Sequence, residues 1–317
     1  MTTQLQYGMG GDRPYGLYYE HSGRTPIGSL ILAGAVGVLA AIIAGIVYAY
    51  VVEFVPYIKL RFLATMGFGA MVGYVTARIA KTGKVRSLAV GLAIVGTATL
   101  VGFYVCWVVW TKVMLDEIFH SQPKYSLHYL DLILSPKYFW GWIVRFNKAG
   151  IWRMSKSDTE NVKGVFLSLI WFGEAVSIFG CSLFVAFKVL REEMFCEACN
   201  RWCGKPAIIR RLVVGDPIRL RQTLEAHDFS YLDTLEPTAG DRYWEVNHDY
   251  CSSCKKLHAV SVKQNLITRN KKGVVTGRKM STVVDRLLLE EAEAELLRKG
   301  PQKGDVNNTP TAPDAAV

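Results

Sequence analysis

Four stretches with few or no charged residues dominate the first 190 positions of the chain. Residues 25–52, 62–77 and 87–111 contain no Asp, Glu, Lys or Arg, and residues 164–187 contain a single acid, Glu174. A helix needs roughly 20 apolar residues to cross the hydrocarbon core of a bilayer. We therefore expect an α-helical integral membrane domain over residues 27–190, with about four transmembrane helices at residues 27–55, 59–80, 87–111 and 164–187.

Small residues recur at intervals of four on the first two of these stretches. Gly37, Ala41 and Gly45 share one face of the first predicted helix, and Gly69 and Gly73 share one face of the second. Such spacing lets helix backbones approach closely inside a membrane, where apolar burial does not favour helix association. The pattern favours tight packing within the bundle, and self-association through the same faces is the alternative.

Cations between the second and third stretches predict how the protein is oriented in the membrane. This connector carries Arg78, Lys81, Lys84 and Arg86 and no acid. Short connectors that are rich in Lys and Arg stay on the cytosolic side. Because the number of predicted spans is even, both termini are expected in the cytosol, including a loosely ordered N-terminal tail, residues 1–26.

The long connector before the fourth stretch predicts a helix of a different kind. Ser135 and Pro136 have the form of an N-cap followed by proline at the first helical position, and Gly150 is a stop signal. Between them, large apolar side chains recur every three to four residues and share one helix face: Phe139, Trp142, Ile143 and Phe146. We expect an interfacial amphipathic segment, residues 125–152, on the outer membrane surface.

Beyond residue 190 the chain becomes polar and charged, which predicts a soluble domain over residues 191–300. Apolar or alternating runs predict strands at residues 207–214 and 257–268, with a helix at residues 219–226 between them. The capping pair Thr282 and Asp285 predicts a C-terminal helix over residues 283–299. His248 and Asp249 stand beside turn-forming residues, which favours a surface loop. The polar residues 301–317 are expected to be a disordered tail.

Two cysteine pairs mark this soluble domain, Cys196-x2-Cys199 and Cys251-x2-Cys254. Two such pairs can close a tetrahedral sulfur site, and zinc is the usual occupant. Each pair resembles half of a zinc ribbon, in which two CxxC turns on β-hairpins share one ion, and the resemblance covers residues 196–254 only. It implies an α+β zinc-ribbon-like domain with a structural zinc ion held by the four cysteines.

The chain departs from the ribbon pattern in two respects. Asn200 and Lys255 follow the second cysteine of each pair, where ribbons commonly have Gly, and a left-handed turn there suits Asn better than Lys. The 51 residues between the pairs must also fold as a structure of their own. Cys203 and His258, each four residues beyond a pair, could replace a ligand or remain bystanders. Residues 188–195 contain no Gly or Pro that would end a helix, so the fourth helix is expected to continue into the first cysteine pair.

Glu174 is the one acid well inside a predicted span. A carboxylate is costly there unless it is protonated, paired or facing a polar cavity. One interpretation is a proton or ion site, and the other is a hydrogen bond to Ser168, Ser177 or Thr97.

Charge and composition limit the function classes. The first 187 residues carry 16 Lys and Arg against 9 Asp and Glu, so the net charge of +10 mostly reflects membrane-flanking cations, and nucleic-acid binding is not expected. No cluster of His, Asp and Glu stands within or beside the spans, which favours a non-enzymatic multi-pass membrane protein. Its expected partners are the lipid bilayer and either another protein or a second copy, docked through the zinc-bearing domain. A transporter or channel component that uses Glu174 is the alternative.

Overall fold

The computed structural model describes residues 17–54, 58–119, 128–150 and 162–299 of the chain. The chain divides into two compact units, His21–Glu192 and a second unit that combines Met1–Glu20 with Glu193–Val317. The C-terminal tail expected to be disordered lies outside the described residues, as does the N-terminal tail up to residue 16.

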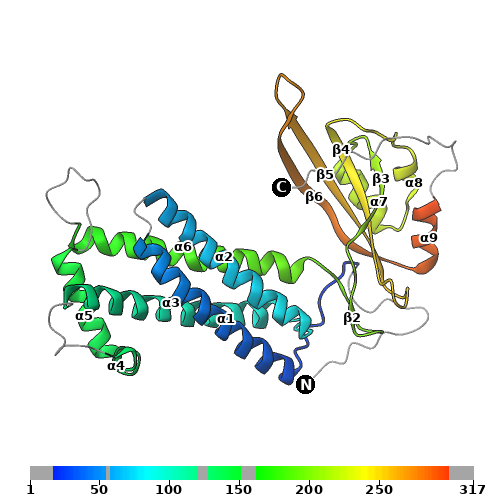
Figure 1. Cartoon of the computed structure of the whole chain (residues 1–317). Coiled ribbons are helices and arrows are strands. Elements are labelled where there is room, and N and C mark those ends of the chain that lie inside the picture. Colours follow the sequence, from blue (N-terminus) through cyan, green and yellow to red (C-terminus); the bar gives the residue numbers. More distant parts are fainter. Residues whose placement is uncertain (1–16, 55–57, 120–127, 151–161, 300–317) are drawn as a thin grey trace. The chain divides into compact units, whose positions relative to one another are not determined.

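The first unit contains four long helices: α1 (Ile27–Phe54), α2 (Ile58–Thr82), α3 (Leu88–Ile118) and α6 (Gly164–Arg191). They run side by side (Figure 1), and within the described residues these four are long and apolar enough to cross a bilayer. Length and composition therefore suggest a membrane protein. Helix α3 continues past its predicted end at Thr111. In this extension Lys112 forms an ion pair with Asp116, which follows one helical turn later.

The small residues predicted to permit close packing lie at helix contacts inside the bundle. A Cβ atom added to Gly45 of α1 would lie 2.3 Å from the carbonyl oxygen of Gly102 in α3. One added to Gly69 of α2 would lie 2.4 Å from the carbonyl oxygen of Ile178 in α6. Backbone stands against backbone at these positions, so packing within the bundle is confirmed as their role.

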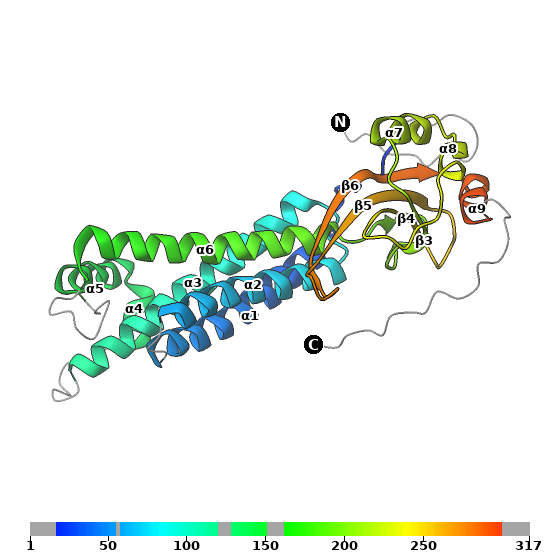
Figure 2. The same ribbon diagram turned by 90° about the horizontal axis from the view of Figure 1, so that it is seen from above.

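Two shorter helices, α4 (Tyr129–Leu134) and α5 (Pro136–Ala149), pack at one end of the bundle (Figures 1 and 2). Helix α5 begins after Ser135 and ends before Gly150, as the sequence predicts. Its apolar face is buried within the protein: Phe139 stacks edge-on against Tyr104 of α3, and Phe146 against Trp110. Helix α3 therefore covers this face, and the position of the segment at the outer membrane surface stays a prediction.

The second unit is built on a four-stranded antiparallel sheet in the order β3-β4-β5-β6. Its strands are β3 (Ala207–Leu212), β4 (Arg242–Tyr250), β5 (His258–Arg269) and β6 (Val275–Leu289). Helices α7 (Pro217–Glu225), α8 (Ser230–Asp233) and α9 (Glu291–Lys299) complete a core centred on the fully buried Trp244. A short hairpin, β1 (Phe195–Cys196) and β2 (Arg201–Trp202), precedes the sheet.

Three local predictions for this unit are wrong. Residues 283–289 belong to strand β6, and the final helix starts only at Glu291, because cross-strand pairing of Val284 and Leu287 with β5 overrides the local capping signal. His248 and Asp249 lie buried in β4 and not in a surface loop. Helix α6 ends at Arg191 and so does not continue into the first cysteine pair.

Part of the predicted N-terminal tail belongs to this second unit. The Leu288 N–H donates to the Leu17 carbonyl, and the Tyr19 N–H donates to the Arg286 carbonyl, both at 2.9 Å. The Tyr19 hydroxyl accepts a hydrogen bond of 2.7 Å from the N–H of Phe195, beside the first cysteine pair. Residues 17–19 therefore pair with the edge strand β6, through a bridge between Tyr18 and Leu287.

Candidate metal centre and bundle cavity

The first cysteine pair occupies the turn of the short β1–β2 hairpin. Phe195 pairs with Trp202, and Cys196 pairs with Arg201. Asn200 closes the turn with a φ of 54°, in the left-handed region that the ribbon resemblance requires after the second cysteine. Since Asn reaches this region at little cost, the hairpin folds back tightly enough for both thiols to lie on one side.

The second pair forms the turn that joins β4 to β5. The Cys251 N–H donates to the Leu257 carbonyl at 3.0 Å, and the Lys255 N–H donates back to the Cys251 carbonyl at 2.9 Å. Lys255 has the same φ of 54° as Asn200, so both turns adopt one backbone geometry although neither contains Gly. The two CxxC turns are therefore equivalent knuckles, one on a very short hairpin and one on a long one.

The four predicted ligands converge on one point between these knuckles. The sulfur atoms of Cys196, Cys199, Cys251 and Cys254 all lie within 4.8 Å of one another. The Cys196 and Cys254 sulfurs stand 3.4 Å apart, and those of Cys199 and Cys251 stand 3.3 Å apart. All four are free thiols and not disulfides, so the cluster could hold a metal ion.

Backbone N–H groups favour the charged form of Cys251 in particular. Burial opposes ionisation of Cys251, but the N–H groups of Cys254 and Ser253 and the Cys199 thiol lower its pKa to about 6. Burial is the main reason that the pKa of Cys196 rises to about 12. Four adjacent thiols cannot all become thiolates unless a cation compensates their charge. This donor set therefore suits a metal ion.

The two alternative ligands have other partners. The His258 Nε2 lies 2.6 Å from the Lys255 carbonyl oxygen, and its Nδ1 lies 3.2 Å from the Nε2 of buried His248. Cys203 packs in the same apolar cluster as the four thiols, but it is not part of the group whose sulfurs meet. Burial raises its pKa to about 12. Neither residue belongs to the group of four converging ligands.

Glu174 lies between helices and meets a partner that the sequence did not suggest. The Tyr48 hydroxyl of α1 donates to the Glu174 Oε1 of α6 at 2.5 Å, and Tyr48 also shares a 2.7 Å hydrogen bond with Thr65 of α2. Of the expected partners, Ser168 and Ser177 donate to carbonyls of their own helix instead. Glu174 thus links α6 to α1, and through Tyr48 to α2.

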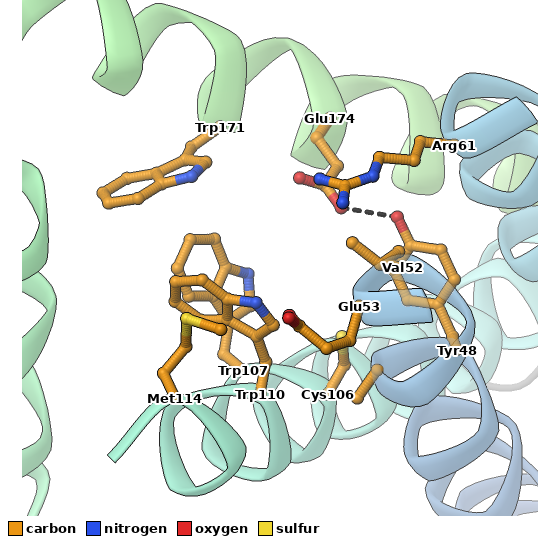
Figure 3. A pocket seen from close by; sticks show the side chains of 11 residues that line it. Tyr48, Val52, Glu53, Arg61, Cys106, Trp107, Trp110, Met114, Trp171 and Glu174 are labelled. Atoms are coloured by element: carbon orange, nitrogen blue, oxygen red, sulfur yellow. Dashed lines mark hydrogen bonds between the residues drawn. The ribbon is translucent and has the colours of Figure 1, made fainter. Parts of the chain in front are cut away.

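A cavity of about 110 Å³ opens beside Glu174 (Figure 3). Four helices of the bundle contribute its described lining: Tyr48, Ala49, Val52 and Glu53 from α1, Arg61 from α2, Cys106, Trp107, Trp110 and Met114 from α3, and Trp171 and Glu174 from α6. Sequence reasoning missed Glu53 and Arg61 because each stands at the end of a span, where charges are ordinary. The available signal was the short connector between the predicted spans at residues 27–55 and 59–80, which brings the end of the first span close to the start of the second.

Comparisons of the chain with known protein families, with curated proteins and with solved structures found no match. The class of protein is therefore defined by the structure alone. The described part of the chain has four helices with the length and composition of membrane spans, followed by a sheet-containing unit with a cluster of four cysteines.

Proposed function

We propose that the protein is a multi-pass membrane protein whose C-terminal unit is a zinc-stabilised module that docks a partner protein or steadies an assembly. The observation that carries the proposal is the meeting of four sulfurs contributed by two distant CxxC turns. Such a site stabilises a small domain by constraining its loops. The proposed role is therefore recognition and not catalysis.

The geometry of the sulfurs supports zinc as the ion. Four thiolates bound at about 2.3 Å to one tetrahedral ion stand about 3.8 Å from one another. The observed separations, 3.3 Å and 3.4 Å for two pairs and within 4.8 Å for all, are compatible with this value. A closed set of four thiolates leaves no coordination position for water or substrate, which supports a structural ion.

We further propose that both termini and the zinc module face the cytosol. The cation-rich connector between α2 and α3 supports this orientation through the positive-inside rule. Reduced thiols, which the site requires, persist in the cytosol. Labelling of intact cells with a membrane-impermeant thiol reagent tests the orientation, because modification of Cys199 or Cys254 from outside would contradict it.

The test of the zinc module starts from the purified full-length chain in detergent. Elemental analysis is expected to find one zinc ion per chain, and the Cys251→Ser variant is expected to lose it. Cys181→Ser in α6 is the matched control, because that thiol lies outside the cluster and its loss should leave the zinc content unchanged. Wild-type protein without zinc would remove the basis of the proposal.

Docking is tested by affinity purification of the same three proteins with quantitative mass spectrometry. A companion that is specific for the module is expected with the wild type and with Cys181→Ser, and it is expected to be lost with Cys251→Ser. A companion that binds Cys251→Ser equally well would show that the zinc module is not its docking site.

The bundle cavity favours a second candidate function, a transporter or channel component that uses Glu174. The carboxyl lies beside a cavity that also contains Glu53 and Arg61, and intramembrane ionisable groups commonly mark ion or substrate pathways. Flux measured in proteoliposomes tests this candidate. Glu174→Gln is expected to abolish a flux that the wild type supports, and an unchanged flux would rule out the transport role.

A further inference from the structure

The lining of the bundle cavity carries more acidic than basic side chains. Among the described lining residues, the carboxyls of Glu53 and Glu174 face the single guanidinium of Arg61. With both acids ionised, the lining is one positive charge short of neutrality. An uncompensated charge inside a membrane bundle is expensive, so a bound cation would stabilise this arrangement.

The apolar part of the lining has the chemistry that attracts organic cations. Trp107 and Trp110 of α3 and Trp171 of α6 meet at steep angles: the Trp107 and Trp171 rings are perpendicular at 5.0 Å, and the Trp110 and Trp171 planes cross at 71° with centroids 6.5 Å apart. Figure 3 shows these rings on one side of the cavity, with Glu174 and Arg61 on the other. Indole faces attract ammonium groups more strongly than other aromatic rings do.

A hard metal ion suits the same lining poorly. Calcium takes six to eight oxygen ligands and magnesium requires a near-octahedral set. The described side chains of the cavity offer oxygen atoms only from Glu53, Glu174 and Tyr48, and the Tyr48 hydroxyl already donates to Glu174. The remaining groups are indoles, aliphatic side chains, the sulfurs of Cys106 and Met114 and the guanidinium of Arg61, none of which is a ligand for a hard ion. An alkylammonium group needs one countercharge and several aromatic faces, which this cavity provides.

The geometry points to the bundle cavity as a binding site for an alkylammonium group, with Glu174 as its countercharge and Trp107, Trp110 and Trp171 as its aromatic wall. Tyr48 positions the Glu174 carboxylate by donating to one of its oxygens. The group can belong to a free quaternary or primary amine or to a choline or ethanolamine lipid headgroup, since both present the same chemistry. The site is independent of the zinc module, and it requires binding but no flux.

Calorimetry on the delipidated full-length chain in detergent, with choline and tetramethylammonium as probes and sodium as the comparison ion, tests a free ligand. Saturable binding of the organic cations is expected. Glu174→Gln is expected to weaken binding at least about tenfold, which is the effect of about 1.4 kcal/mol. Trp171→Leu is expected to weaken it to a similar degree and Trp171→Phe less, because Phe keeps an aromatic face. Trp140→Leu, at an exposed position of α5, is the matched control and should bind as the wild type does.

Native mass spectrometry of the same variants, purified gently from membranes, tests a lipid headgroup. Retention of a choline or ethanolamine lipid by the wild type and by Trp140→Leu, with its loss from Trp171→Leu, would support the site with a lipid as its source. Wild-type protein that binds neither probe and retains no such lipid would overturn the inference, whatever the variants do. Binding that prefers sodium, or that is equal in Trp171→Leu and Trp140→Leu, would overturn it as well.

Discussion

Gly73 of α2 stands so close to Ser182 of α6 that an added Cβ atom would lie 2.2 Å from the Ser182 carbonyl oxygen. The neighbouring contact is polar, because the Ser182 hydroxyl shares a 2.7 Å hydrogen bond with Thr99 of α3. Backbone proximity and a buried hydroxyl pair therefore join three helices at one level of the bundle. This contact fixes how α2 and α6 pack, since no side chain separates them.

Gly73→Ala should destabilise the bundle by about 1–3 kcal/mol, the usual cost of overpacking a core, because the new methyl group meets backbone that cannot rotate away. Gly180→Ala on α6 is the control. A Cβ added there meets nothing within 4 Å, so this change should be neutral or stabilise the helix by about 0.5–1 kcal/mol. Equilibrium unfolding in mixed micelles measures both, and equal effects would show that α2 and α6 are not in close contact.

Tyr48 and Glu174 should be energetically coupled. A double-mutant cycle with Tyr48→Phe and Glu174→Met removes the donor and the acceptor with little change in volume. Hydrogen bonds between helices in membranes average about 0.6 kcal/mol and reach about 1.7 kcal/mol, and we expect a coupling in this range. Unfolding in micelles supplies the four free energies, and strictly additive single effects would mean that the hydrogen bond does not form.

Lys255 tests whether the second knuckle depends on its left-handed residue. Lys255→Gly should leave the proposed zinc affinity of the cluster unchanged and the stability of the unit unchanged or slightly higher, because Gly adopts a φ of 54° without the penalty that a side chain incurs. Lys255→Val should destabilise the unit by about 1 kcal/mol, since β-branching adds to the penalty that Lys already incurs in the left-handed region. Competition with a chromophoric zinc chelator and thermal unfolding distinguish the two variants, and equal behaviour of Gly and Val would contradict the turn geometry.

His248 should make the C-terminal unit sensitive to acid. Its burial in β4, followed by the nearness of His258 and Arg298, lowers the pKa of His248 from 6.5 to about 4. Above pH 6.5 the imidazole is neutral whether the unit is folded or unfolded. As the pH falls from 6.5 to 4 the unfolded chain takes up the proton first, so stability declines by at most about 3 kcal/mol.

The His248 contribution can be separated from release of the metal ion in acid. Denaturant unfolding at pH 7.5, 6, 5 and 4 should show a shallower loss of stability for His248→Phe than for the wild type. Metal release affects both proteins, so the difference between the two slopes reports the histidine. Parallel slopes would mean that His248 is not held neutral by its surroundings.

Tyr19 should tie the N-terminal segment to the first knuckle. Tyr19→Phe removes the hydroxyl that accepts a hydrogen bond from the Phe195 N–H. The free energy of unfolding should fall by about 1–3 kcal/mol, because the N–H of the buried Phe195 then loses this acceptor. Hydrogen exchange should then become faster in residues 194–203. Leu17→Ala, at a half-exposed position, should leave exchange there unchanged. Unaltered exchange of residues 194–203 in Tyr19→Phe would show that the N-terminal segment does not stabilise the first knuckle.

The sequence by itself determined the membrane-like helices and the cysteine knuckles. A run without charge is a property of about 20 successive residues, so it can be recognised along the chain. The start and stop of α5 at Ser135 and Gly150 depend on local backbone signals and can be recognised in the same way. The left-handed residues Asn200 and Lys255 follow from the CxxC turn itself, because the geometry of the turn lies within a few neighbouring residues.

Only the tertiary structure decided which distant residues meet. Strand pairing turned residues 283–289 from the expected helix into β6, and packing of the bundle brought the apolar face of α5 against α3. The partner of Glu174 is Tyr48, which lies 126 positions away in the chain. Sequence spacing encodes which face of a helix is apolar, but the neighbour that covers this face depends on the packing of the whole bundle.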